Sequence, residues 1–175
     1  AGKSTLIKII AGLHQHSSGT LLVDGRETHF SSPRDAQAAG ISTVFQDLAL
    51  CEPLDVVENL FLGNEAVRGG MLDEVEMEKR AWELLSQLAA RVPSVRMPVS
   101  ALSGGQRQRV ALARAVLDPD RRVLVFDEPT AHLDIETELE LKERMLPLME
   151  GRLVVFATHR LHWVHDMYAV QIGRA

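Results

Sequence analysis

Two kinds of hydrophobic pattern divide the chain into expected strands and helices. Apolar runs at 123–126 and 153–157, and a β-rich run at 41–45, predict short strands. The run at 123–126 is continuous, which is typical of a strand buried on both faces. From Ser103 onward helix, strand, helix and strand follow one another, and this alternation predicts a parallel α/β sheet.

Three further elements are expected in the first forty residues. A helix should follow Ser4, with one apolar face formed by Leu6, Ile9, Ile10 and Leu13. Residues 19–30 predict a hairpin that turns at an Asp-Gly pair. Residues 32–40 predict a short helix with serine as its N-cap, proline at its first position and glycine at its end.

The middle of the chain is expected to be helical. Residues 55–62 and 73–90 have helical periodicity, and the second of these segments has an apolar face formed by Ala81, Leu84, Leu85 and Leu88. Residues 91–102 contain two prolines and little periodicity. We therefore interpret residues 91–102 as a linker.

Composition and charge narrow the class of protein. The 175 residues suggest one domain, and 46% hydrophobic with 25% charged residues is an ordinary globular composition. It excludes a disordered tail and a disulfide-rich miniprotein, and no apolar run reaches the roughly 18 residues of a membrane span. The single Cys51 fits a reducing compartment, and a net charge of −5 gives no overall attraction to nucleic acid.

The chain opens on what reads as half of a phosphate-binding motif. Gly2, Lys3 and Ser4 match the last three positions of the G-x-x-x-x-G-K-[ST] pattern. In a complete loop, backbone amides and the helix N-terminus hold phosphates, Lys3 reaches the outer phosphates and Ser4 binds Mg²⁺. Taken alone, these residues fit an ordinary amphipathic helix equally well. Because the chain begins with Ala1 rather than Met, we expect an N-terminally truncated domain.

A second candidate phosphate site lies at the start of a later helix. Ser103 and Gln106 have the S-x-x-Q spacing of a capping box, and Gly104 and Gly105 leave the backbone amides open to a ligand. An ordinary helix start does not need two glycines at these positions. This helix N-terminus therefore suits a phosphate group.

Two carboxylates follow the run at 123–126. Asp127 and Glu128 are expected at the carboxyl edge of the sheet, where α/β proteins bind ligands. Adjacent strand residues point to opposite faces, so we expect different roles for the two side chains. Asp127 suits Mg²⁺, and Glu128 suits the role of proton acceptor for an attacking water. The alternative is a solvated acidic pair at a strand end.

A histidine follows the last apolar run at the same expected edge. From there the imidazole of His159 could approach a γ-phosphate. Because His162 and His165 come next, a zinc site is the alternative. On a helix His165 would rotate away from the other two, and no cysteine lies nearby, so we favour the phosphate role.

Together these motifs resemble the ATP-binding cassette (ABC) ATPases. The segments AGKST, TVFQD, LSGGQRQ, VLVFDEP, AHLD and ATHR occur in the order of that family, and LSGGQ separates it from other P-loop NTPases. The resemblance covers essentially the whole chain. It implies an α/β fold, with a P-loop NTPase (RecA-like) parallel-sheet core at 1–50 and 116–175 and an inserted α-helical signature subdomain at 51–115.

The resemblance implies that two such domains bind two ATP molecules between them, head to tail. The residues expected to contact nucleotide, from one domain or from its partner, are Gly2, Lys3, Ser4, Thr5, Ser103, Gly104, Gly105, Gln106 and Asp134. Asp134 would also couple the two sites across the interface.

The resemblance implies the catalytic roles as well. Mg²⁺ would be held by Ser4, Gln46 and Asp127. Glu128 would act as the general base of ATP hydrolysis, and Gln46 would sense the γ-phosphate. His159 would stabilise the charge on the γ-phosphate in the transition state.

Two segments of the chain resemble cassettes that transport different substrates. Residues 5–63 are similar to carbohydrate importers of the ribose and xylose type, whereas residues 127–163 are similar to the thiol exporters of cytochrome bd assembly. We favour an ATPase subunit that powers carbohydrate import, bound to permease subunits at the cytoplasmic face of the cell membrane. The alternatives are the nucleotide-binding domain of a thiol or peptide exporter, a non-transport ATPase of DNA repair or translation, and a cassette that binds ATP without turnover. We expect no nucleic-acid partner, and poor activity from residues 1–175 alone.

Overall fold

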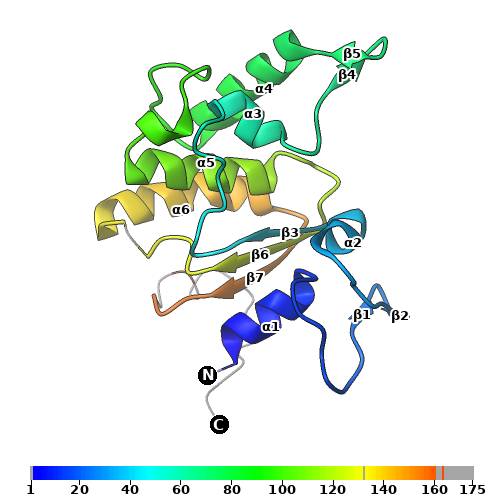
Figure 1. Ribbon diagram of the computed structural model, residues 1–175. Helices are drawn as coiled ribbons and strands as arrows, with labels where there is room; N and C mark the ends of the chain where they lie inside the picture. Colours follow the sequence, from blue (N-terminus) through cyan, green and yellow to red (C-terminus); the bar gives the residue numbers. More distant parts are fainter. Residues whose placement is uncertain (1, 132, 161–162, 164–175) are drawn as a thin grey trace.

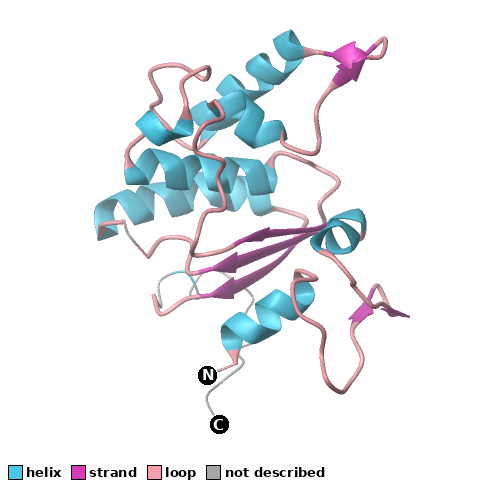
Figure 2. Cartoon of the chain, in the orientation of Figure 1, coloured by secondary structure: helices cyan, strands magenta, loops and turns pink. Residues whose placement is uncertain are grey.

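The centre of the molecule is a three-stranded parallel sheet. The computed structural model describes residues 2–131, 133–160 and 163. The strands of this sheet are β3 (Ile41–Val44), β6 (Val123–Asp127) and β7 (Leu153–Ala157), in the order β3-β6-β7 (Figure 2). Leu124, Val125 and Phe126 of the middle strand are fully buried. The predicted parallel α/β architecture and the buried strand at 123–126 are therefore confirmed.

Helices cover both faces of this sheet (Figure 1). The α-helices among the described residues are α1 (Lys3–Ile10), α2 (Pro33–Ala38), α3 (Val56–Phe61), α4 (Glu74–Gln87), α5 (Gly104–Val116) and α6 (Ile135–Met149). Because side chains alternate along a strand, Val125 joins a core cluster with Ile7 of α1, whereas Leu124 and Phe126 join the cluster that contains α5 and α6. Helix α1 and helix α5 therefore lie on opposite faces of the sheet.

Several element boundaries follow from local hydrogen bonds. The N–H groups of Ser31 and Ser32 both donate to the Asp35 carboxylate at 2.8 Å, which fixes the start of α2. At α3, Asp55 accepts from the N–H of Glu58 at 2.8 Å, as an N-cap residue does. The predicted hairpin is present as the antiparallel strands β1 (Leu22–Val23) and β2 (Arg26–Glu27).

The helices α3, α4 and α5 form a layer above the sheet, together with a second small hairpin (Figure 1). This hairpin consists of β4 (Val67–Arg68) and β5 (Met71–Leu72). The predicted apolar face of α4 is buried, and its residues share one continuous cluster with α5, α6 and β6. The division into a core and a subdomain at 51–115 stays a prediction. Within the described ranges, no helix is both long and apolar enough to cross a membrane.

The interpretation of residues 91–102 as a linker is wrong. This segment includes a short 3-10 helix (Val99–Ala101), and it is packed into the helical layer through Val92, Val95, Val99 and Leu102, all of which are buried. Its backbone is bonded as well, since the N–H of Val57 donates to the Val95 carbonyl at 3.2 Å. A loop can bury apolar side chains at irregular intervals, so the lack of periodicity did not indicate exposure.

The predicted apolar face of α1 is covered only in part, since Ile10 packs against the core cluster that contains Ile7. Leu6 is 43% exposed and Leu13, which lies beyond the end of the helix, is 47% exposed. The helix contacts the sheet through a narrower stripe that includes Ile7 and Ala11, which are 2% and 4% exposed. The sequence marks several apolar positions here, and only the docking angle of the helix decides which of them is covered.

Candidate functional site

The three parallel strands end at one edge of the sheet, and the predicted catalytic residues follow them directly. Val44 of β3 is in register with Phe126 of β6, and Asp127 of β6 is in register with Ala157 of β7. Gln46, Glu128 and His159 come one or two residues after these strands. The carboxyl edge of a parallel sheet is where α/β proteins bind ligands, so the placement of these residues agrees with the predicted site.

Glu128 and His159 approach each other at this edge. The Nε2 atom of His159 lies 3.4 Å from Oε1 of Glu128. The Glu128 side chain is only 19% exposed, whereas the His159 side chain is 76% exposed. A largely buried carboxylate beneath an accessible imidazole is an arrangement that can take a proton from water and stabilise negative charge above it.

The backbone at Glu128 departs from the expected strand. The strand β6 ends at Asp127, and Glu128 has a φ of 49°, in the left-handed region that costs a non-glycine residue about 1–3 kcal/mol. Its N–H donates to the carbonyl of Ala157 at 2.8 Å, which holds this turn against β7. The two carboxylates are therefore separated by a backbone turn, and the expectation that they alternate as strand neighbours is wrong.

The N-terminus of α1 has the features of an anion site. Gly2 has a φ of 99°, a conformation that favours glycine, and the three residues after it are exposed. The first-turn N–H groups of a helix have no partner within that helix, and the helix dipole adds positive charge there. The first turn of α1 contains no acidic side chain, and Lys3 adds a cation.

The N-terminus of α5 has the predicted capping box. The N–H of Ser103 donates to Oε1 of Gln106 at 2.9 Å, and the N–H of Gln106 donates to the Ser103 hydroxyl at 3.3 Å. Nε2 of Gln106 also donates to the carbonyl of Arg91, so this amide holds the loop against the helix. A side chain at Gly104 would meet nothing within 4 Å, which leaves the first-turn backbone open to a ligand.

The structure does not bring the two candidate phosphate sites together within one chain. Lys3 begins α1 on one face of the sheet, and Ser103 caps α5 on the other face (Figure 1). The α5 terminus lies instead beside the loop after β6, since a Cβ atom at Gly105 would be 3.7 Å from the Leu133 side chain.

Asp134 follows this loop and caps α6. Its carboxylate accepts from the N–H of Thr137 at 2.9 Å and from the Thr137 hydroxyl at 2.7 Å. These hydrogen bonds, the backbone bond first, lower the pKa of the exposed Asp134 carboxyl. Asp134 is therefore an ionised, oriented group on the surface.

The segment after Gln46 is held by a residue that the sequence analysis missed. The guanidinium of Arg114, near the end of α5, donates to the carbonyls of Leu48 and Ala49 at 3.0 and 2.9 Å. Burial lowers the pKa of Arg114. Gln46 itself is exposed, so it extends from a loop that is anchored to the glycine-rich helix.

A second missed feature is the buried carboxylate of Glu138 on α6. It lies on the same helix face as Leu141 and Met145, which are fully buried. A charged residue three positions before this apolar stripe, at helical spacing, was the available signal. Its partners include Thr130, Arg160 and Trp163.

The described residues give no support to a metal cluster. Among them, no group of three or more His, Cys, Asp or Glu side chains is arranged to hold a metal ion. His162 and His165, on which the zinc alternative depends, lie outside the described residues.

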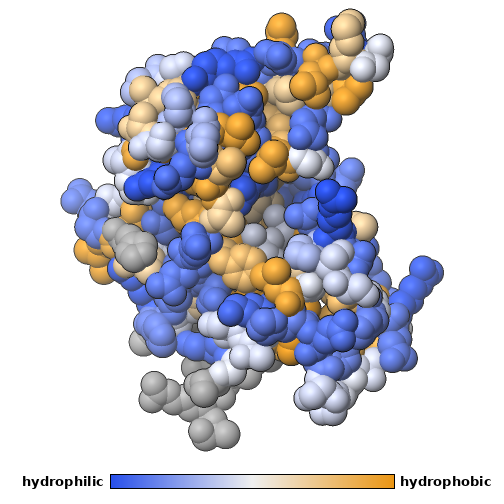
Figure 3. Space-filling model, viewed as in Figure 1, coloured by the Kyte–Doolittle hydropathy of each residue, from blue (hydrophilic) through white to orange (hydrophobic). Residues whose placement is uncertain are grey.

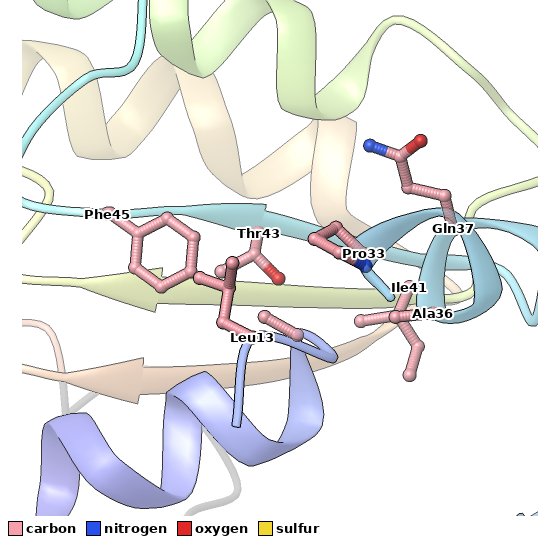
Figure 4. Close-up of a pocket in the computed structure, with 8 residues that line it drawn as sticks. Leu13, Pro33, Ala36, Gln37, Ile41, Thr43 and Phe45 are labelled. Carbon is pink, nitrogen blue, oxygen red and sulfur yellow. The ribbon is translucent and has the colours of Figure 1, made fainter. Parts of the chain in front are cut away.

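The small cavity of Figure 4 is lined by other residues than the predicted site residues. It has a volume of about 110 Å³, below the roughly 300 Å³ of a typical ligand pocket. Its lining comes from the end of α1, from α2 and from β3, and consists of Ala11, Leu13, Pro33, Ala36, Gln37, Ile41, Thr43 and Phe45. This cavity is mostly apolar and contains none of the predicted site residues.

Comparison with known proteins identifies the class. The family model described as ABC transporter matches residues 1–131. The arabinose import ATP-binding protein AraG of Chromohalobacter salexigens is 40% identical over 168 residues, which cover 95% of this chain and 34% of that protein. The xylose/arabinose import ATP-binding protein XylG of Sulfolobus acidocaldarius is 42% identical over 162 residues, covering 92% of this chain and 64% of that protein.

The fold agrees with this class. The dimeric, post-hydrolysis structure of the ATP-binding cassette MJ0796, bound to ADP and Pi, matches with a TM-score of 0.78 and 31% identity, over 93% of this chain and 72% of that chain. The chain belongs to the ABC transporter family, and its α/β fold is the P-loop NTPase fold of ABC cassettes. It spans about a third of the length of AraG.

Proposed function

We propose that this chain is an ATP-binding and ATP-hydrolysing cassette that powers carbohydrate import. The observation that carries the proposal is the 3.4 Å approach of His159 to Glu128 at the carboxyl edge of the sheet. A carboxylate base for the attacking water beside an exposed imidazole that can donate to phosphate oxygens suits in-line attack of water on a γ-phosphate. The names of the relatives, which are sugar import ATP-binding proteins, support the direction and the kind of cargo.

The phosphates of ATP would bind at the α1 N-terminus. The exposed Lys3 and the backbone amides of Ser4 and Thr5 supply positive charge and donors there. Oxygen ligands suit Mg²⁺, and the hydroxyl of Ser4, the carboxylate of Asp127 and the amide of Gln46 offer that donor set. Mg²⁺, when bound, neutralises charge on the phosphates.

Within this site each residue has a separate task. Glu128 takes the proton of the attacking water, and its burial beside β7 keeps the carboxylate in one orientation. His159 donates toward the γ-phosphate oxygens as negative charge develops on them. Gln46 senses the γ-phosphate at the same edge of the sheet, and it extends there from the loop that Arg114 anchors.

A second cassette would complete each site. Because Lys3 and Ser103 lie on helices of opposite faces, Ser103, Gly104 and Gly105 would close on the nucleotide bound by the partner cassette. Gln106 would hold that helix start in shape through its bonds to Ser103 and Arg91. The dimeric cassettes among the similar structures support this arrangement.

A substitution at the α5 N-terminus tests the two-cassette site. Ser103→Arg in the full-length protein should lower ATP turnover at least about tenfold, because a long cation would block closure on the partner's nucleotide. Binding of ATP to a single cassette, measured with a fluorescent nucleotide, should change by less than about twofold.

The matched control for this prediction is Ser100→Arg. Ser100 is also exposed, three residues earlier, and is bonded through its backbone N–H to the Glu52 carbonyl. Its substitution should leave turnover unchanged. Equal losses of ATP binding and turnover in Ser103→Arg would argue against the head-to-tail arrangement.

The partner in the membrane would be a sugar permease at the cytoplasmic face. Large apolar side chains are exposed on the β4–β5 hairpin and the start of α4, seen as an orange group in Figure 3, namely Val67, Met71, Leu72 and Val75. Exposed apolar groups of this kind are typical of protein contacts. Uptake of labelled arabinose, xylose or ribose by cells with and without the gene tests the proposed cargo.

A further inference from the structure

A single buried carboxylate connects the two loops that carry Glu128 and His159. The Glu138 side chain on α6 is fully buried. It accepts a hydrogen bond from the hydroxyl of Thr130, which lies two residues after Glu128. It also pairs with the guanidinium of Arg160, the residue directly after His159.

Arg160 extends this connection to the loop before α6. Its Nη2 atom donates to the carbonyl of Leu133 at 3.0 Å and to that of Ala131 at 3.4 Å. Its backbone N–H donates to the Thr158 hydroxyl at 3.0 Å, which closes the turn that presents His159. The loop after β6 and the loop after β7 are therefore joined by side-chain bonds, and not only by the sheet.

An aromatic group also contacts this carboxylate. The indole Nε1 of Trp163 donates to Oε1 of Glu138 at 2.8 Å, and the indole ring stacks on Phe156 of β7 at 4.7 Å. Burial acts to raise the pKa of Glu138, but the hydrogen bonds from Thr130, Trp163 and Arg160 outweigh it, so the pKa is lowered. Glu138 is consequently an anion at neutral pH.

Stability alone does not account for a charge pair at this place. On the same helix face Leu141 and Met145 are fully buried and apolar, and Lys142, four positions after Glu138, is a further buried charged residue. Apolar residues in place of a buried ion pair are often neutral or stabilising, so a buried pair is weak evidence of a stabilising role. The pair instead fixes the loop after β6 relative to the loop after β7, because its charge-assisted hydrogen bonds are directional.

We propose that Glu138 and Arg160 are positioning residues that set the separation of Glu128 and His159 for ATP hydrolysis. This inference rests on the function proposed above. Neither residue touches the reacting atoms, but they hold the backbone on both sides of the pair that lies 3.4 Å apart. A misplacement of about 1 Å in a catalytic group can lower a rate by about a hundredfold, so such a device has a measurable effect.

Glu138→Gln in the full-length protein tests the proposal. The amide keeps the size of the side chain and removes the charge that orients Arg160. We expect kcat for ATP to fall between about tenfold and a hundredfold, with KM for ATP within about twofold of the original. A role in folding alone would lower the active fraction and leave kcat per folded molecule unchanged.

The matched control is Glu140→Gln, two residues further on the same helix. Glu140 is exposed and pairs with the largely buried Arg109 and with the exposed Arg144. The same chemical change there should leave kcat and KM unchanged. Thermal unfolding of each variant, followed by circular dichroism, defines the temperature at which all of them are folded for the assay.

If Glu138→Gln does not fold, a second variant tests the positioning role. Thr130→Val keeps the shape of the buried side chain and removes the bond that joins the Glu128 loop to Glu138. It should lower kcat at least about threefold without changing KM. An unchanged kcat in a folded variant overturns the positioning role. If the original protein does not hydrolyse ATP, the proposed function is wrong instead.

Discussion

Glu128→Gln should lower the rate of ATP hydrolysis of the full-length protein by about 10²–10⁴-fold while ATP still binds. The amide keeps the length of the side chain and cannot accept a proton from water. Because the α1 N-terminus and Lys3 are untouched, the phosphates keep their binding groups. ATP held without turnover should also stabilise the closed pair of cassettes, so size-exclusion chromatography with ATP and Mg²⁺ should show more dimer.

The control for Glu128→Gln is Glu143→Gln, on the exposed side of α6. It makes the same chemical change away from the sheet edge, and we expect original turnover and an unchanged ratio of monomer to dimer. Original turnover in Glu128→Gln would exclude this residue as the general base. Loss of nucleotide binding in that variant would instead indicate that Glu128 holds the ligand.

Phe126→Ala should lower the free energy of unfolding of this cassette by about 3–5 kcal/mol. Phe126 is fully buried in the middle strand, and its ring stacks on Phe156 with ring centres 4.7 Å apart. Phe156 in turn stacks on Trp163, the partner of Glu138. The truncation removes apolar contact and leaves a cavity between the sheet and the helices α5 and α6.

Urea unfolding of the full-length protein measures the effect, and Leu153→Ala is the matched control. Leu153 lies on the neighbouring strand and is 64% exposed, so its truncation should cost less than about 1 kcal/mol. Since domains average 5–15 kcal/mol of stability, the Phe126 variant should unfold at a clearly lower urea concentration. Equal shifts in both variants would mean that the apolar contact at β6 is not what stabilises this region.

The local elements could be predicted where short-range physics determines them. The cap at Ser103 depends on a side chain and a backbone N–H three residues apart, and it is present as expected. The continuous run at 123–126 fixed a central strand, because only a doubly covered strand tolerates so many apolar residues. Glu128 and His159 could be predicted as site residues because each of them follows a predicted parallel strand, and parallel strands end at one edge of the sheet.

The errors come from contacts between distant segments. Residues 91–102 have no periodicity, yet four of them are buried because α3 and α5 supply a surface for them. The exposed Leu6 shows that a helix with several apolar positions does not reveal which of them meets the sheet. The bond of the Glu128 N–H to Ala157 supports a left-handed turn that no local pattern indicated.

The sequence by itself determined the family, the order of helices and strands, and the residues with candidate chemistry, since these depend on neighbours along the chain. The tertiary structure decided how that chemistry is assembled. It brought His159 to 3.4 Å from Glu128 and placed Lys3 and Ser103 on opposite faces of the sheet. It also buried Glu138 between two loops far apart in the sequence. Such contacts depend on how β6, β7 and α6 pack together, which local propensity does not specify.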